Sequence, residues 1–438
     1  MGTSPPTIKL DYSLPMFQNK KLVGKALRSR NNYIQRLHVN LPMQYKRPIH
    51  RWIRAALEAN VEDICISYTR EETRIPKGTF SSDSLKKLAL VIPHTRIELP
   101  RPRSESESLY LPRLEYLKLD YIPSTDEEQI NKLVSSCPAI EYLDLMLRDD
   151  DNGDDHGIRI ASPTLKHLKI RKYSGRVSLS LYAPKLVSLI FESATNNVYL
   201  EDVSSLVNAT IVSKEHRGYD ISSDPTAQKT SLEVLHNVQC LTIPVPLLQD
   251  FPGIPQFIEN QVSEQFGNLR HLKLLRVDFS WSSSVFIIAS FLSMSPNIES
   301  PTLDVTRYRP WDSASSQDEL LKGELELLSV MFTLNKLKIV KIFNFKGSGI
   351  EIKLLEILSR KANVLEKFCI FGKAVDRLAD TSVTEKILDD VIQLRKNSGL
   401  PNVGILLKMG KLGTGSKKII FSLSGTQLTF SSVTPIII

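Results

Sequence analysis

Cysteine is scarce in this 438-residue chain, and its four cysteines lie far apart in the sequence. Cys65, Cys137, Cys240 and Cys369 form no C-x-x-C pair, no zinc-ligand spacing and no disulfide framework. We therefore expect reduced thiols and no bound metal. The N-terminus also lacks the apolar core of a signal peptide, so a nuclear or cytoplasmic protein is expected rather than a secreted one.

Long apolar runs and a uniform excess of charge are lacking as well. The most apolar run, 285–294, is about half of the roughly 20 residues that a bilayer-spanning helix needs, so no membrane partner is expected. The net charge is +8, but residues 1–50 hold nine Lys or Arg and a single acid, which leaves 47 bases and 47 acids in the rest of the chain. A positive charge that is concentrated in the first 50 residues is only weak evidence for nucleic-acid binding.

Motifs of catalysis and cofactor binding are absent from the sequence. The segment 410–417 resembles a phosphate-binding loop, but Ser416 stands where the lysine is required. The acidic segment 148–155 fails as a calcium loop because Arg148 occupies a ligand position. No two histidines are spaced four residues apart for zinc. These absences predict a protein that is not an enzyme and that uses no cofactor.

What the sequence does contain is a repeat. A six-residue unit, apolar-x-x-apolar-x-apolar, recurs thirteen times with steps of 20 to 39 residues, most of them in or just beyond the 20–29 range of leucine-rich repeats. Its copies start at Ile34, Val61, Leu85, Leu114, Ile140, Leu165, Leu186, Leu206, Val238, Leu269, Ile298, Leu337 and Leu365. No single copy is specific, but the series is.

Each unit predicts a short strand that buries alternate side chains and needs neighbouring repeats to do so. The predicted fold class is therefore α/β, an irregular leucine-rich-repeat solenoid with a parallel sheet on the concave face and helices or loops on the convex face. Amphipathic patterns predict helices over 48–59, 125–134, 283–292 and 352–358. Thr125 and Glu128 form a plausible capping box for the second helix. The segment 173–184 is too short and polar for more than a turn or a second strand.

The repeats resemble those of a known family. The motifs that carry the resemblance are Ile49-His-Arg-Trp-Ile-Arg-Ala-Ala56, Leu111-Pro-x-Leu-Glu-x-Leu-x-Leu119, Ser136-Cys-Pro-x-Ile-Glu-x-Leu143, Ser162-Pro-x-Leu-Lys-x-Leu168 and Ala183-Pro-x-Leu186. They resemble the successive repeats of plant F-box/LRR/FBD proteins, and residues 337–370 are similar to the FBD-type end of those proteins. The resemblance covers residues 31 to 407.

The resemblance implies a non-enzymatic protein-interaction module that selects substrates for an SCF-type ubiquitin ligase. In that family an N-terminal F-box binds a Skp-type adaptor, and the repeats are thought to hold the substrate. Residues 1–50 contain Leu14-Pro15 and Leu41-Pro42 but lack the helices and the closing motif of an F-box. The chain is therefore expected to lack an F-box, whether through truncation, as a fragment, or as a receptor that has lost its ligase.

The candidate binding residues come from the two positions that flank the middle apolar residue of each unit, because these alternate with the buried ones. Over the thirteen units they include seven Lys or Arg and two acids, Asp63 and Asp144. Basic and aromatic residues together are typical of protein interfaces, so we expect an acidic protein partner, although lysine is also an ordinary solvent-tolerant strand residue. The candidate partner-binding residues are Tyr116, Lys118, Tyr142, His167, Lys169, His271 and Lys273.

The expected domains are a basic N-terminal segment over 1–30, a leucine-rich-repeat solenoid over 31–310, FBD-like C-terminal repeats over 311–407 and a basic flexible tail over 408–438. Three functions remain open from the sequence. The first is substrate recognition for an SCF-type ligase if an F-box is supplied, through a Skp-type adaptor. The second is a free-standing scaffold or decoy without ligase assembly. The third and weakest is a nucleic-acid accessory protein that binds through the basic ends.

Overall fold

The structure is a computed structural model, and it describes a large part of the chain in separate stretches. These are residues 7–11, 35–41, 49–68, 75–92, 97, 99, 109–123, 127–148, 156–172, 177–193, 198–213, 235–245, 248, 266–279, 282–305, 323, 326, 333–345, 347–372, 404–409, 418–424 and 427–433. The chain divides into two compact units. Unit 1 contains residues 1–206 and 210–234, and unit 2 contains residues 207–209 and 235–438.

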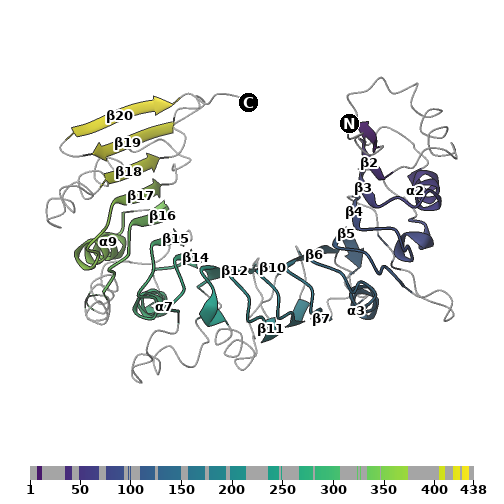
Figure 1. Cartoon of the computed structure of the whole chain (residues 1–438). Helices are drawn as coiled ribbons and strands as arrows, with labels where there is room; N and C mark the ends of the chain where they lie inside the picture. The colour runs from purple at the N-terminus through teal and green to yellow at the C-terminus, as the bar shows by residue number, and fades with distance from the viewer. Residues whose placement is uncertain are drawn as a thin grey trace, which may run out of the picture. The chain divides into compact units, whose positions relative to one another are not determined.

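A parallel sheet forms the framework of unit 1 (Figure 1). Its strands, each paired with the next, are β1 (Thr7–Asp11), β2 (Arg36–Leu41), β3 (Asp63–Tyr68), β4 (Lys87–Val91), β5 (Tyr116–Pro123), β6 (Tyr142–Arg148), β8 (His167–Lys172) and β10 (Ser188–Ser193). From β2 onward these strands coincide with the predicted six-residue units. No strand was predicted for the N-terminal segment that contains β1.

The strands form because alternate residues can be buried on one face of the sheet. In β8, Leu168 and Ile170 are buried while Lys169 and Arg171 are only partly so. The parallel register keeps equivalent residues of successive repeats opposite one another, so that Leu143 pairs with Leu168 and both are buried. Each repeat thereby closes the core of its neighbour.

Helices cover the buried face of the sheet in the first repeats of unit 1. They are α2 (Ile49–Glu58), the 3-10 helix η1 (Lys77–Phe80) and α3 (Glu127–Ser135). In α2 the buried side chains are Ile49, Trp52, Ile53 and Ala56, which confirms the helix and the apolar face predicted for 48–59. The helix predicted over 125–134 is α3, and the proposed capping Thr125 lies outside the described residues.

Strands replace the helices in the three repeats that follow, two of which are short. The segments β7 (His156–Ala161), β9 (Val177–Tyr182) and β11 (Val198–Asp202) form a second, three-stranded parallel sheet. The repeats that start at Leu165 and Leu186 are 21 and 20 residues long, too short for a helix with its two connections. Strand β9 shows that, of the two alternatives expected for 173–184, a turn or a second strand, the segment forms a strand. In each unit, we call the front face the side of the parallel sheet that lies opposite the returning helices and strands.

Three strands that precede a helix carry a β-bulge near their end. The register of β5 shifts at Tyr121, and the same happens at Arg276 of β14 (His271–Val277) and Asn344 of β16 (Ile339–Phe345). These three residues have positive φ angles of 65°, 58° and 59°. A bulge with a left-handed residue bends the strand. It turns the chain out of the sheet ahead of the helix that follows.

Unit 2 repeats the same construction. Its parallel strands are β13 (Cys240–Pro244), β14, β15 (Ser300–Val305), β16, β17 (Lys367–Gly372) and β18 (Gly404–Met409). The helices α7 (Ser282–Ser293) and α9 (Gly349–Lys361) lie along one face of this sheet (Figure 1), and they confirm the helices predicted over 283–292 and 352–358. Strand β12 (Asn208–Ser213) contains residues of both units, and η3 (Leu235–Asn237) precedes β13. No helix among the described residues is long and apolar enough to cross a membrane.

The C-terminal end differs from the expected flexible tail over 408–438. Strands β19 (Lys418–Ser424) and β20 (Gln427–Val433) form an antiparallel hairpin, and β19 pairs with β18. The tail prediction rested on glycine, serine and lysine, and it overlooked the alternation of apolar residues within 418–433. The expected boundaries at residues 30, 310 and 407 stay predictions.

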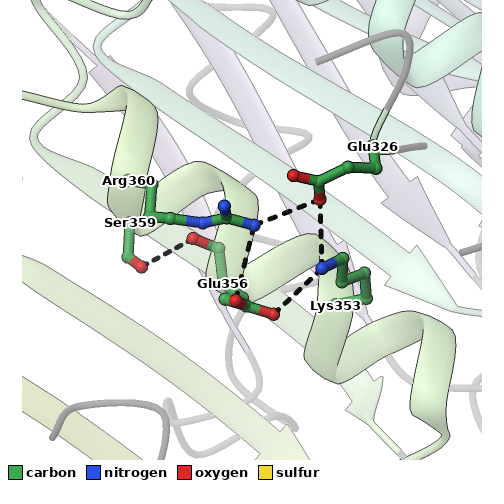
Figure 2. A network of polar contacts seen from close by, with 5 residues as sticks. All are labelled: Glu326, Lys353, Glu356, Ser359 and Arg360. Atoms are coloured by element: carbon green, nitrogen blue, oxygen red, sulfur yellow. Dashed lines mark hydrogen bonds and ion pairs between the residues drawn. The ribbon is translucent and has the colours of Figure 1, made fainter. Parts of the chain in front are cut away.

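Helix α9 is fixed at both ends by polar contacts that the sequence analysis missed. At its start, Ser348 accepts a hydrogen bond from the backbone of Glu351, whose carboxylate accepts one in return from the backbone N–H of Ser348. Towards its other end, Figure 2 shows Glu326 between Lys353, at 3.0 Å, and Arg360, at 3.1 Å. The hydrogen bond from Lys353, with the help of Arg360, lowers the pKa of Glu326.

The described residues therefore form a mixed α/β leucine-rich-repeat architecture with mostly parallel sheets. This confirms the α/β class and the parallel sheet. The closer description as one solenoid stays a prediction.

Candidate partner-binding face

Three of the predicted binding residues meet on the front face of unit 1. Tyr116 in β5, Tyr142 in β6 and His167 in β8 are register partners across neighbouring strands. Lys87 of β4 occupies the same register position beside Tyr116. They line up because each occupies the first flanking position of its repeat unit, and strands of a sheet lie about 4.8 Å apart.

The four side chains form a continuous row, which we call the aromatic ladder (Lys87, Tyr116, Tyr142 and His167). The Nζ atom of Lys87 lies 4.7 Å from the ring centroid of Tyr116. The rings of Tyr116 and Tyr142 stack with a centroid distance of 4.4 Å and an interplanar angle of 7°. His167 follows at 6.0 Å with a tilt of 43°. A cation over an aromatic face and a stacked ring pair are each favourable contacts, so the ladder is a pre-ordered surface.

The phenol of Tyr116 stays protonated over the whole physiological range. Burial raises its pKa to about 12, with further contributions from Tyr142 and from the negative charge of Asp144. A protonated phenol can donate a hydrogen bond as well as accept one. The ladder therefore offers both flat apolar rings and a polar edge to a partner.

A group of charged side chains lies next to the ladder, and we call it the charge cluster (Lys118, Asp120, Asp144 and Arg171). At its centre is the buried carboxylate of Asp144, whose side chain is only 3% exposed. Lys118 Nζ lies 3.4 Å and an Arg171 side-chain nitrogen 3.0 Å from the two oxygens of this carboxylate. Asp144 is therefore held by two cations from the strands on either side, β5 and β8.

Asp120 completes the charge cluster. It lies in β5 two residues beyond Lys118, and its Oδ1 atom is 3.8 Å from Arg171. This oxygen is buried and makes no hydrogen bond among the described residues. Burial raises the pKa of Asp120, and the charges of Lys118 and Arg171 oppose that effect only in part. Burial in these surroundings disfavours the ionised form of the carboxyl group.

The balance of charge on this face is positive. Lys87, Lys118, Lys169 and Arg171 face two acids, Asp120 and Asp144. Lys169 is the register partner of Asp144 but belongs to no ion pair in the part of the chain that the structure describes. Lys87 likewise belongs to no ion pair among the described residues, and its Nζ atom lies over the ring of Tyr116. These two lysines are the cations with charge to offer a partner.

The other two predicted residues, His271 and Lys273, do not join this group. Both lie in β14 of unit 2, where they are exposed on the front face of that unit's sheet. The seven predicted residues therefore divide into five on unit 1 and two on unit 2.

Sequence reasoning left Asp120 and Arg171 out of the site. Both lie four residues after the first flanking position of their strand, beyond the end of the six-residue unit. The same alternation extended by one step along each strand would have included them. The contact between them could not have been read from sequence, because Arg171 reaches across β6 to a residue two strands away.

Unit 1 also brings His38, Asp63 and Cys65 close in register, residue types that occur in nucleophilic sites. His38 Nε2 lies 2.9 Å from Asp63 Oδ2, and Cys65 is the register partner of His38. Burial raises the pKa of the Cys65 thiol, with Asp63 adding to the effect, which opposes a reactive thiolate. Among the described residues no group of three or more His, Cys, Asp or Glu could hold a metal ion.

Parallel strands repeated at intervals of 20 to 29 residues, with helices or short strands returning behind them, define a leucine-rich-repeat protein. The comparison with protein families agrees, because residues 49–211 match the family "FBD-associated F-box protein At5g56370, LRR repeats". This confirms the resemblance seen in the sequence: the repeat region is similar to that of plant F-box/LRR/FBD proteins.

Several relatives from Arabidopsis thaliana are similar over most of both chains. The chain is 24% identical to the FBD-associated F-box protein At5g56370, over 87% of its own length and 81% of the relative's. It is 26% identical to the F-box protein At3g62430, over 81% of its own length and 78% of the relative's. It is 20% identical to the F-box/FBD/LRR-repeat protein At1g13570, over 81% and 76%.

Proposed function

We propose that this chain is the protein-interaction module of an F-box/LRR-type protein and that it recognises the substrate of an SCF-type E3 ubiquitin ligase if an F-box is supplied. The names of its relatives support a place among F-box proteins. The observation that carries the binding role is the aromatic ladder beside the charge cluster on the front face of unit 1. A row of pre-ordered rings beside lysines that form no ion pair with another described residue is suited to contact another protein.

The partner we propose is a protein with an acidic segment. Lys87 and Lys169 belong to no ion pair among the described residues, so a partner carboxylate can approach them without breaking an ion pair of that kind. The rings of Tyr116 and Tyr142 provide the half-buried area that interface hot spots require. We propose a nuclear or cytoplasmic location, since the thiols are expected to stay reduced.

The binding face is tested with a quadruple alanine variant of Tyr116, Lys118, Tyr142 and Lys169. Partners that wild type captures should be lost from this variant. If the variant captures the same partners as wild type, the ladder is not the binding face.

A matched control variant carries the same kinds of residue on the opposite side of unit 1. Arg159, Tyr182, Lys185 and Tyr199 are exposed on or beside the three-stranded sheet of β7, β9 and β11. Replacement of these four by alanine should leave capture unchanged. Loss in both variants would point to a general loss of folding instead of a defined face.

The alternative is a free-standing leucine-rich-repeat scaffold or decoy that binds the same partner without ligase assembly. Co-precipitation with a Skp-type adaptor separates the two functions. Adaptor binding by this chain supports the ligase role. Absence of adaptor binding by a folded chain that still captures its partner supports the scaffold role.

A further inference from the structure

A second aromatic pair lies on the front face of unit 2. The rings of Phe343 in β16 and Phe371 in β17 stack with a centroid distance of 4.3 Å and an interplanar angle of 3°. They stack because the two residues are register partners in parallel strands. Both side chains are half-buried, whereas Val340 and Ile342 of β16 point to the other side of the sheet and are each 1% exposed.

Lysines surround this pair. Lys273 Nζ lies 5.9 Å from the ring centroid of Phe343. Lys341 lies two residues before Phe343 on the same strand face, and Lys367 lies on β17, where it pairs in register with Ile339. None of these three lysines belongs to an ion pair within the described stretches of unit 2.

Among the described residues of the same sheet face, one acid, Asp304, stands against these three lysines. Asp304 of β15 is the register partner of Phe343, and its carboxylate accepts a hydrogen bond from the side chain of Asn344 at 2.8 Å. Glu299 lies in the turn before β15 and is engaged by Arg270 and Lys338. Thr242 and Thr302 occupy the register positions on either side of Lys273, and no ion pair joins Lys273 to Asp304 within the described residues.

A purely structural role does not account for this arrangement. Rings that served only the core would point to the buried side, as Phe345 and Phe368 do at 3% and 2% exposure. Lysines that served only solubility would be as effective beside acids, and elsewhere in unit 2 they are so placed, as in the pair of Lys338 and Glu299. On this surface, apolar rings lie beside cations that form no ion pair within the described part of unit 2.

We propose that this surface is a second interaction face, separate from the aromatic ladder of unit 1, and that it binds an acidic protein segment carrying an aromatic anchor. The carboxylates of the segment would pair with Lys273, Lys341 and Lys367, and its ring would pack on the edge of the Phe343–Phe371 stack. The two faces differ in chemistry. The ladder of unit 1 has phenol groups that form hydrogen bonds, whereas the rings of unit 2 have none, so unit 2 favours an apolar anchor.

The test measures the binding of short fluorescent peptides to the full chain by anisotropy at low salt. The first peptide alternates glutamate with tryptophan, the second replaces glutamate by glutamine, and the third replaces tryptophan by serine. We expect the first to bind at least about tenfold more tightly than either of the others, since both the charge and the ring contribute. Equal binding of all three peptides would overturn the proposal.

The site of binding is assigned with charge-reversal variants. The double variant Lys273→Glu/Lys341→Glu should weaken binding of the first peptide by at least about tenfold. The control Lys336→Glu/Lys361→Glu makes the same change of charge in unit 2, in the turn before β16 and at the end of α9, and should retain most of the binding. An equal loss in both double variants would show that net charge alone attracts the peptide, and it would contradict binding at this surface.

Two further variants keep the result independent of folding and of the function proposed for unit 1. Phe343→Leu retains an apolar side chain in the fold but removes the ring, and it should weaken the first peptide while unfolding at a similar denaturant concentration to wild type. The quadruple alanine variant of the unit 1 face should bind the first peptide as wild type does. If instead only that variant loses the peptide, the peptide binds to unit 1, and the proposal of a second interaction face on unit 2 is wrong.

Discussion

The ring of Tyr116 lies flat on the ring of Tyr142, with 4.4 Å between their centroids, because the two residues occupy the same position in consecutive repeats. Parallel strands place equivalent residues about 4.8 Å apart. This distance is close to the separation at which aromatic rings stack favourably. The repeat itself therefore converts identical residues into an ordered surface.

Replacing Tyr142 should affect binding more than stability. Tyr142→Ala removes the ring between Tyr116 and His167, so the ladder is interrupted and capture of the partner should be lost. The half-buried ring contributes about 1 kcal/mol or somewhat more to the free energy of unfolding, which denaturant titration can measure. Tyr142→Phe keeps the ring and should retain most of the binding. If both variants lose binding equally, the hydroxyl group and not the stack is the recognised feature.

Substitution of the two aspartates of the charge cluster should affect the free energy of unfolding differently. Asp144→Asn leaves Arg171 and Lys118 without their buried carboxylate, so it should lower the free energy of unfolding at pH 7 by about 2 kcal/mol or more. Asp120→Asn should not lower it at pH 7, because burial raises the pKa of Asp120 and ionisation in the fold is unfavourable. Denaturant titrations of both variants at pH 7 measure the difference, and equal losses of stability would contradict it.

The pH dependence of Asp120 follows from the same shift. Between the ordinary value of 3.8 and the raised pKa in the fold, the folded protein holds a proton that the unfolded chain has released. Stability due to this residue therefore falls as the pH rises through that window. Urea titrations from acid to neutral pH should show the unfolding free energy of wild type falling relative to that of Asp120→Asn as the pH rises through this window. A parallel pair of curves would contradict the raised pKa.

The contribution of the α9 capping box to the free energy of unfolding should be measurable with single substitutions of Ser348. Ser348→Ala removes the oxygen that accepts the hydrogen bond from the backbone of Glu351, and it should cost about 1 kcal/mol in the free energy of unfolding. Ser348→Thr keeps that oxygen and should cost clearly less. The exposed Thr333 offers a control, since Thr333→Ala removes a similar hydroxyl group from outside the helix. Equal losses from Ser348→Ala and Ser348→Thr would contradict a capping role.

The four thiols should differ in reactivity. Burial raises the pKa of Cys137 to about 11, with a weaker opposing effect from the hydroxyl of Ser136, so almost no thiolate forms at pH 8. Cys65 and Cys240 are half-buried, and Cys369 is buried. Alkylation at pH 8 followed by mass spectrometry should label Cys65 and Cys240 before Cys137 and Cys369. Rapid labelling of Cys137 in the folded protein would contradict its burial.

Much of the fold could be predicted because its signals are local. The spacing of Leu114, Leu117 and Leu119 predicts one buried strand, and thirteen such units predict a parallel sheet. The apolar face of α2 could be read in the same way from Trp52 and Ile53. The hairpin of β19 and β20 was missed because glycine, serine and lysine dominated the interpretation of that segment.

The candidate site was predicted only in part, for a similar reason. The positions of Tyr116, Tyr142 and His167 follow from alternation within each unit, which is a property of one strand at a time. The contact of Arg171 with Asp120 depends on a side chain that spans two strands, and no pattern within one repeat contains it. The same holds for the stack of Phe343 on Phe371, which joins two repeats.

The repeat, its strands and the buried side of each strand can be read from the amino-acid order, because they depend on the local alternation of apolar and polar residues. Which residues of different repeats touch depends instead on how the strands pair in three dimensions. Register brings Lys87, Tyr116, Tyr142 and His167 into one row, and it places Asp144 between Lys118 and Arg171. Contacts of this kind join residues some 25 to 50 positions apart, and their geometry is fixed by the hydrogen bonds between strands.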